Sequence, residues 1–204
     1  MTYTLYQGDL PDGLDLGPLV AVDSETMGLT VPRDRLCLVQ LSAGDGRAHL
    51  VQLAAGDYRA PNLRRLLADP KVTKLLHFAR FDLAAFGHWL GVWAAPVWCT
   101  KVASKLVRTF TDRHGLKDLC RELLGIDIAK QQQSSDWGAP VLTPEQLAYA
   151  AADVLYLHRL RAILQEMLRR EGRLELAEAC FAFLPTRARL DLLGGWEAVD
   201  VLAH

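Results

Sequence analysis

The sequence predicts an α/β fold in which a group of strands comes first and helices alternate with strands afterwards. Short apolar runs bounded by turn residues fill much of the first fifty residues, as buried strands do. Apolar residues at helical spacing then alternate with further short apolar runs. A strongly capped helix follows late in the chain. This succession is typical of a sheet flanked by helices.

The first predicted strands follow one another closely. They are expected at residues 19–22, 35–42 and 48–53. Residues 42–46, SAGDG, are turn formers and should join the last two strands as a hairpin. Three consecutive strands with short connections predict an antiparallel start to the sheet.

The next part of the chain should alternate. Helices are expected at residues 62–67, 81–90, 101–110 and 115–124, and strands at 72–78 and 97–99. Residues 127–141 are polar and irregular and predict a long loop.

The late helix has a clear start. Thr143 can cap it, Pro144 fits its first turn, and Gln146 completes a capping box. One helix should run from there to about residue 170, and another over 174–183. We therefore expect a single domain over residues 1–204, with a helical C-terminal tail from about residue 172 to 204 packed on it and no additional helical nucleic-acid-binding domain.

The composition of the chain excludes some classes of protein. The 204 residues carry 23 Lys and Arg against 24 Asp and Glu, which argues against a generally basic surface that coats nucleic acid. The four cysteines form no CxxC pair and lie among apolar residues, which predicts buried thiols in a reducing compartment. We find neither a signal-peptide pattern nor an apolar run long enough for a bilayer, so we expect a cytoplasmic protein with no membrane partner.

Two carboxylates follow the first apolar strand. Because strand side chains alternate between faces, Asp23 and Glu25 should point to the same side. Paired carboxylates repel each other unless a cation lies between them, and oxygen ligands suit Mg²⁺ or Mn²⁺. Taken alone, however, this pair is more often a solvated strand end.

Two further carboxylates, Asp82 and Asp153, lie on predicted helices and are candidate site residues. Asp82 should lie in the first turn of a helix that follows a strand, where a carboxylate is also favoured by the helix dipole alone. Tyr149 and Asp153 are four residues apart and should share one helix face, although a core tyrosine beside a boundary aspartate fits as well.

Taken in order, these motifs resemble the DEDD superfamily of 3′–5′ exonucleases, in the tyrosine-containing branch, and most closely the ribonuclease D-like exonuclease domain. The resemblance extends from Gly8 to about Leu160. It is carried by the segments AVDSETMGL, LCLVQLS, LLHFARFDLAAF, HGLKDLCRELLG and SSDWGAPVLTPEQLAYAAADVLYLHRL. It implies the ribonuclease H-like fold, a mixed five-stranded sheet flanked by helices.

The resemblance also implies a mechanism and a substrate. Asp23, Glu25, Asp82 and Asp153 would hold two divalent metal ions, Mg²⁺ or Mn²⁺, and Tyr149 would orient the attacking water. The implied activity removes nucleoside monophosphates from the 3′ ends of single-stranded RNA. A DNA exonuclease of the same chemistry and a catalytically silent nucleic-acid-binding module on this fold remain alternatives, as does a structural or regulatory protein.

Substrate contacts are expected close to the motifs. Thr26, Met27, Gly28 and Leu29 follow the first pair, and in the family an apolar side chain at the position of Leu29 wedges near the terminal bases. Plain core packing of Met27 and Leu29 is an equal alternative. The other expected contacts are His77, Phe78, Lys117, Lys130 and Trp137. Phe78 replaces a polar residue common in the family, so it should stack rather than donate a hydrogen bond.

Overall fold

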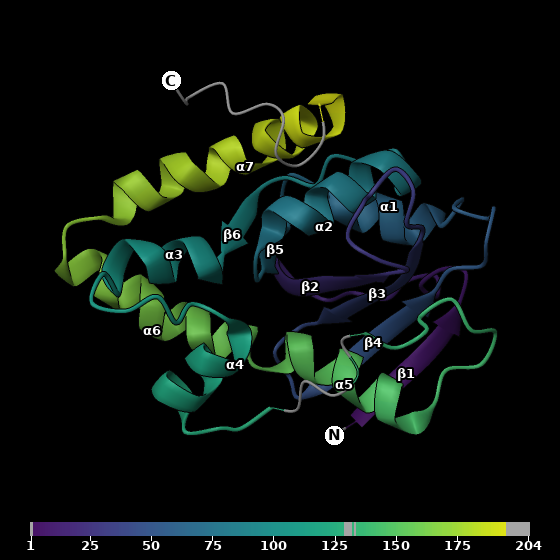
Figure 1. Ribbon diagram of the computed structural model, residues 1–204, viewed down its shortest axis with the longest axis horizontal. Coiled ribbons are helices and arrows are strands. Elements are labelled where there is room, and N and C mark those ends of the chain that lie inside the picture. The colour runs from purple at the N-terminus through teal and green to yellow at the C-terminus, as the bar shows by residue number, and fades with distance from the viewer. Residues whose placement is uncertain (1, 129–131, 133, 195–204) are drawn as a thin grey trace.

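A six-stranded mixed sheet forms the centre of the protein, as the computed structural model shows for residues 2–128, 132 and 134–194 (Figure 1). The strand order is β1-β4-β3-β2-β5-β6. The strands are β1 Thr2–Gln7, β2 Leu19–Thr26, β3 Leu36–Ser42, β4 Arg47–Gln52, β5 Thr73–Leu76 and β6 Val97–Cys99. β2, β3 and β4 pair antiparallel, whereas β5 and β6 continue parallel to β2. The α/β class and the antiparallel start are thereby confirmed.

The sheet has one strand more than the five expected. The extra strand is β1, which pairs parallel with β4 at the edge of the sheet. Its residues alternate between half-buried and exposed positions, so the segment has no continuous apolar run. An edge strand with this pattern gives little hydrophobic signal in the sequence.

Helices cover both faces of the sheet. They are α1 Pro61–Ala68, α2 Ala79–Ala85, α3 Thr100–Val107, α4 Leu116–Leu119, α5 Pro144–Leu155, α6 Leu157–Arg170 and α7 Leu174–Gly194, with π-helical turns η1 Phe86–Leu90 and η2 Cys120–Leu124 after α2 and α4. α5 packs on β2, β3 and β4 from one face, and α1 and α2 lie on the other (Figure 1). α7 packs along α2 and β6, and α3 packs on α6.

The late helical region differs from its prediction in one respect. The capping box is confirmed, because the Thr143 hydroxyl accepts from the Gln146 amide at 3.2 Å and the Thr143 amide donates to Gln146 Oε1 at 2.9 Å. The single helix expected to residue 170 is instead two helices that meet at Tyr156. Their packing partners explain the break, since α5 lies on the sheet and α6 on α3.

The last described helix is longer than predicted. α7 reaches Gly194 rather than residue 183, and it joins α2 through a buried carboxylate. Asp191 accepts from Arg80 of α2 at 2.5 Å and from Arg187 of its own helix at 2.8 Å. The expected tail beyond residue 194 lies outside the described residues. Within the described part of the chain, no helix is both long and apolar enough to cross a bilayer.

Candidate active site

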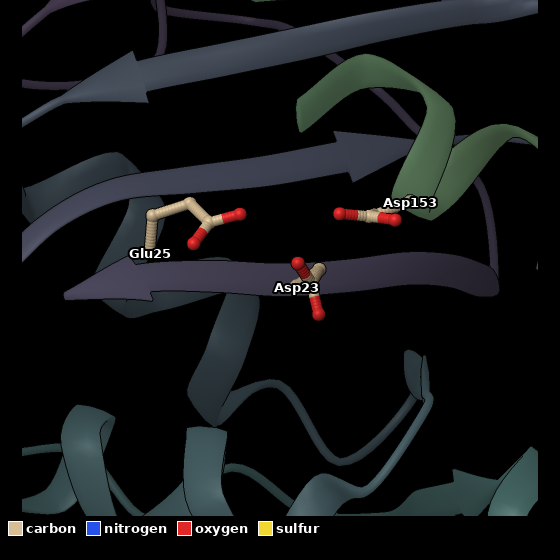
Figure 2. A group of neighbouring side chains, drawn as sticks. All are labelled: Asp23, Glu25 and Asp153. Carbon is tan, nitrogen blue, oxygen red and sulfur yellow. The ribbon is translucent and has the colours of Figure 1, made fainter. Parts of the chain in front are cut away.

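Three carboxylates from two elements meet over one face of the sheet (Figure 2). Asp23 and Glu25 lie on β2, two residues apart, and therefore share a face of that strand. Asp153 reaches them from α5. One ligand oxygen from each residue lies within 4.8 Å of the others. The structure thus brings together three of the four carboxylates that the sequence singled out.

α5 can approach the sheet closely because small residues lie between Tyr149 and Asp153. Ala150, Ala151 and Ala152 are buried there. The four-residue spacing places Tyr149 and Asp153 on one helix face, as predicted. The phenol of Tyr149 lies against the Asp153 carboxyl, and this contact favours the ionised form of Asp153.

The fourth carboxylate, Asp82, comes from α2, which lies on the opposite face of the sheet from α5. It lies in the first turn of α2 and is buried. Its Oδ1 accepts a hydrogen bond from the Ser24 hydroxyl at 2.6 Å. Ser24 was not among the site residues predicted from the sequence. The alternation of side chains along β2 could have identified it, because the residue between Asp23 and Glu25 must face the side on which α2 lies.

The pKa values of all four carboxylates are raised, with burial as the main cause. Burial raises the pKa of Asp23 to about 7, although a backbone hydrogen bond opposes this shift. Burial raises the pKa of Glu25 well above its usual value, and the charges of Asp23, Asp153 and Asp82 raise it further. Burial and the charge of Asp23 likewise raise the pKa values of Asp82 and Asp153.

This electrostatic strain fits a site for divalent cations. Clustered carboxylates that are partly removed from water must either hold protons or share positive charge. The donor set consists of oxygen alone, which Mg²⁺ and Mn²⁺ prefer. The residues present are therefore suited to the metal ions that the sequence analysis expected.

Tyr149 stays protonated beside this cluster. Burial is the main cause that raises the pKa of Tyr149, and the charges of Asp153, Glu25 and Asp23 raise it further. Its ring packs on Trp137, with 6.0 Å between ring centroids. Trp137 is only 1% exposed, so its burial fits a supporting contact to Tyr149 better than the direct substrate contact expected from the sequence.

The segment after β2 contains two exposed apolar side chains. Met27 is 50% exposed and Leu29 is 82% exposed, so the alternative of plain core packing is wrong for both. Thr26 is buried, and its hydroxyl donates to the Gly28 carbonyl. A side chain at Gly28 would place its Cβ 2.5 Å from an Asp34 carboxylate oxygen, so only glycine fits there without a shift.

The predicted contacts at the end of β5 lie in a constrained turn. The Thr100 hydroxyl donates to the Leu76 carbonyl at 3.2 Å and lies 2.8 Å from His77 Nδ1, which therefore donates to it. Burial lowers the pKa of His77 to about 3. Phe78 has a left-handed backbone, φ 64°, which ends the strand before the predicted residue 78. Phe78 is 38% exposed, and Lys101 Nζ lies 3.9 Å from the centre of its ring.

Of the two lysines expected to contact substrate, the structure describes only one. Lys117 is half-buried on α4, and its contact with substrate stays a prediction. Lys130 lies outside the described residues.

Together, the fold and the site define a class of protein. A mixed sheet carries a partly buried group of four carboxylates that is suited to divalent cations, with a neutral phenol beside it. Such centres serve metal-assisted hydrolysis and phosphoryl transfer.

Comparison with known proteins gives the family. The model of the 3′-5′ exonuclease family matches residues 12–169, and the chain belongs to this family. A ribonuclease D of Gluconacetobacter diazotrophicus is 40% identical over 182 residues, which cover 88% of this chain and 46% of that protein. The chain spans about half the length of the curated relatives it matches.

Solved structures agree with this assignment. NrnC of Brucella melitensis bound to pGG is 56% identical, with a TM-score of 0.96 over 100% of this chain and 99% of that one. The same protein with bound Mg²⁺ is 55% identical, with a TM-score of 0.95 and 100% of each chain covered. Escherichia coli RNase D is 28% identical, with a TM-score of 0.73 over 84% of this chain and 45% of that one. The expected ribonuclease D-like resemblance and ribonuclease H-like fold are confirmed.

Proposed function

We propose that this protein is a 3′–5′ exoribonuclease that depends on two divalent metal ions and releases nucleoside monophosphates from RNA 3′ ends. The observation that carries the proposal is the partly buried group of Asp23, Glu25, Asp82 and Asp153 beside Tyr149, in a chain of the 3′–5′ exonuclease family. A catalytically silent module would have no physical reason to keep four clustered, partly buried carboxylates whose pKa values are all raised.

The four carboxylates would hold the metal ions. Four negative charges offset the four positive charges of two divalent ions, so the loaded centre is near neutral before the substrate arrives. When bound, such ions supply a hydroxide nucleophile at neutral pH and stabilise the leaving oxygen. The relative solved with bound Mg²⁺ supports Mg²⁺ as the first ion to test.

Tyr149 would position the attacking water. Because its pKa is raised, the phenol is neutral at physiological pH and acts through a hydrogen bond rather than as a base. Its hydroxyl lies beside Asp153, and its ring is held by Trp137. Both contacts fix the direction in which the hydroxyl can orient a water molecule.

The substrate strand would end against the segment after β2. Met27 and Leu29 present exposed apolar side chains there, which suits stacking against bases of any sequence. The exposed ring of Phe78 offers a second stacking surface near the start of α2. The complex of the Brucella relative with pGG supports short RNA as a substrate.

The direct test uses single-stranded RNA and DNA of equal sequence, labelled at the 5′ end. Wild type, Asp23→Ala and Glu178→Ala are incubated with Mg²⁺, Mn²⁺ or EDTA. Glu178 is an exposed carboxylate on α7 and serves as the matched control.

A metal-dependent ladder that shortens from the 3′ end, faster on RNA, is expected for wild type and Glu178→Ala but not for Asp23→Ala. Faster cleavage of DNA would replace the RNA assignment. Absence of cleavage by folded wild type with either metal would overturn the proposed activity.

A further inference from the structure

Gln40 is a fully buried amide directly beside the carboxylate group. It lies on β3, where it is the antiparallel partner of Asp23 on β2 and of Leu50 on β4. Directly paired residues of neighbouring strands point to the same face, with Cβ atoms about 4.5–5.5 Å apart. Gln40 therefore lies under α5, on the face that presents Asp23 and Glu25 to Asp153. Its exposed fraction is 0%.

The carboxamide of Gln40 is unused within the described part of the protein. Neither its Nε2 nor its Oε1 has a hydrogen-bond partner there. A buried polar group without a partner costs about 1–3 kcal/mol, so a sheet interior that retains one needs an explanation. An apolar side chain of the same length would fill this space without that cost.

A second glutamine on the same face provides the contrast. Gln52 on β4 is also buried, but its amide is satisfied from both sides. Its Oε1 accepts from Gln7 Nε2 at 3.0 Å, and its Nε2 donates to the Ala139 carbonyl at 3.0 Å. These contacts tie β1 and the loop before α5 to the sheet. Gln52 is therefore explained by structure alone, whereas Gln40 is not.

We propose that Gln40 is a positioning residue that holds the Asp23 carboxylate, directly or through one ordered water, in the orientation in which it binds a divalent cation. An amide N–H can donate to the carboxylate oxygen turned away from the cation without adding another negative charge to the cluster. Carboxylates that bind metals are commonly oriented in this way by neighbouring hydrogen-bond donors. The inference rests on the metal site of the proposed function.

The test compares Gln40→Met with Gln52→Met, two replacements of an amide by an apolar side chain of similar length. Mn²⁺ binding is measured by the loss of the free-ion electron paramagnetic resonance signal, without substrate. Thermal unfolding is measured in EDTA. For Gln40→Met we expect Mn²⁺ affinity to fall by about tenfold or more. Its thermal stability in EDTA should be unchanged or higher, because an unsatisfied group is removed.

Gln52→Met should give the opposite result, with lower thermal stability and unchanged Mn²⁺ affinity. Mn²⁺ affinity of Gln40→Met close to that of wild type would overturn the inference, even if its stability changed. Failure of the wild-type protein to bind Mn²⁺ would instead overturn the metal site of the proposed function.

A second measurement covers the case in which Gln40→Met does not fold. Hydrogen exchange of the side-chain amide of Gln40 is followed by NMR in wild type with and without Mg²⁺, and Gln52 serves as the internal reference. Slower exchange at Gln40 alone on Mg²⁺ addition supports the inference. Equal exchange with and without Mg²⁺ contradicts it.

Discussion

Replacing Asp23 by asparagine should stabilise the metal-free protein at neutral and alkaline pH. In the folded protein, burial keeps the Asp23 carboxyl protonated up to about pH 7, whereas in the unfolded chain it ionises near pH 3.8. The folded state therefore binds more protons than the unfolded state between these values. Through this window the Asp23 carboxyl lowers the free energy of unfolding as the pH rises, and asparagine at this position removes that contribution.

The size of the effect follows from the same two values. The interval from 3.8 to about 7, converted at about 1.4 kcal/mol for each pH unit, gives an upper limit of about 4 kcal/mol. For a chain of this size, each kcal/mol corresponds to roughly 2–4 °C in Tm. At pH values above 7, the Tm of Asp23→Asn should therefore exceed that of wild type by at most about 8–16 °C. This difference in Tm should shrink towards zero near pH 4.

The assay is thermal unfolding in EDTA at pH 4.5 and pH 8. Asp112→Asn, which replaces an exposed aspartate, is the matched control and should not differ from wild type by more than about 1 °C. Adding Mg²⁺ at pH 8 should raise the Tm of wild type much more than that of Asp23→Asn, because ligand binding to the folded state stabilises it. Equal Tm values for wild type and Asp23→Asn in EDTA at pH 8 would refute the reasoning.

Three further substitutions test the framework of the site. Tyr149→Phe keeps the ring against Trp137 and removes the hydroxyl, so kcat should fall by about 10²-fold with Mn²⁺ binding retained, as single-turnover kinetics can show. Thr143→Ala removes the helix cap before Tyr149 and should lower the Tm by about 2–4 °C in a thermal scan, with unchanged stability counting against the cap. Asp191→Asn weakens the buried pairs with Arg80 and Arg187 and should cost about 2 kcal/mol in denaturant unfolding, whereas a loss below about 0.5 kcal/mol would contradict their importance.

The sequence could predict the carboxylate group because each part of it depends on a local period. The two-residue period of a strand puts Asp23 and Glu25 on one face, and the helical period aligns Tyr149 with Asp153. The cap at Thr143 also depends on a local pattern and is found where expected. These features require no knowledge of which elements pack together.

The features that the sequence missed depend on tertiary contacts. The edge strand β1 is half exposed, and its pairing with β4 determines its conformation. The break at Tyr156 arises because the two helices pack on different partners. Gln40 lies within an apolar strand pattern, and its importance emerges only from its register with Asp23 and its unused amide. No local period carries that information.

The placement of Asp82 shows why the site depends on α7. α2 begins directly after Phe78, whose left-handed backbone costs about 1–2 kcal/mol, and this helix start has no side-chain cap. The helix therefore depends on other contacts for its position. Ser24 fixes its first turn from the sheet, and Asp191 of α7 holds Arg80, two residues before Asp82. The family match ends at residue 169, before α7 begins, so part of the scaffold of the fourth carboxylate lies outside the matched region.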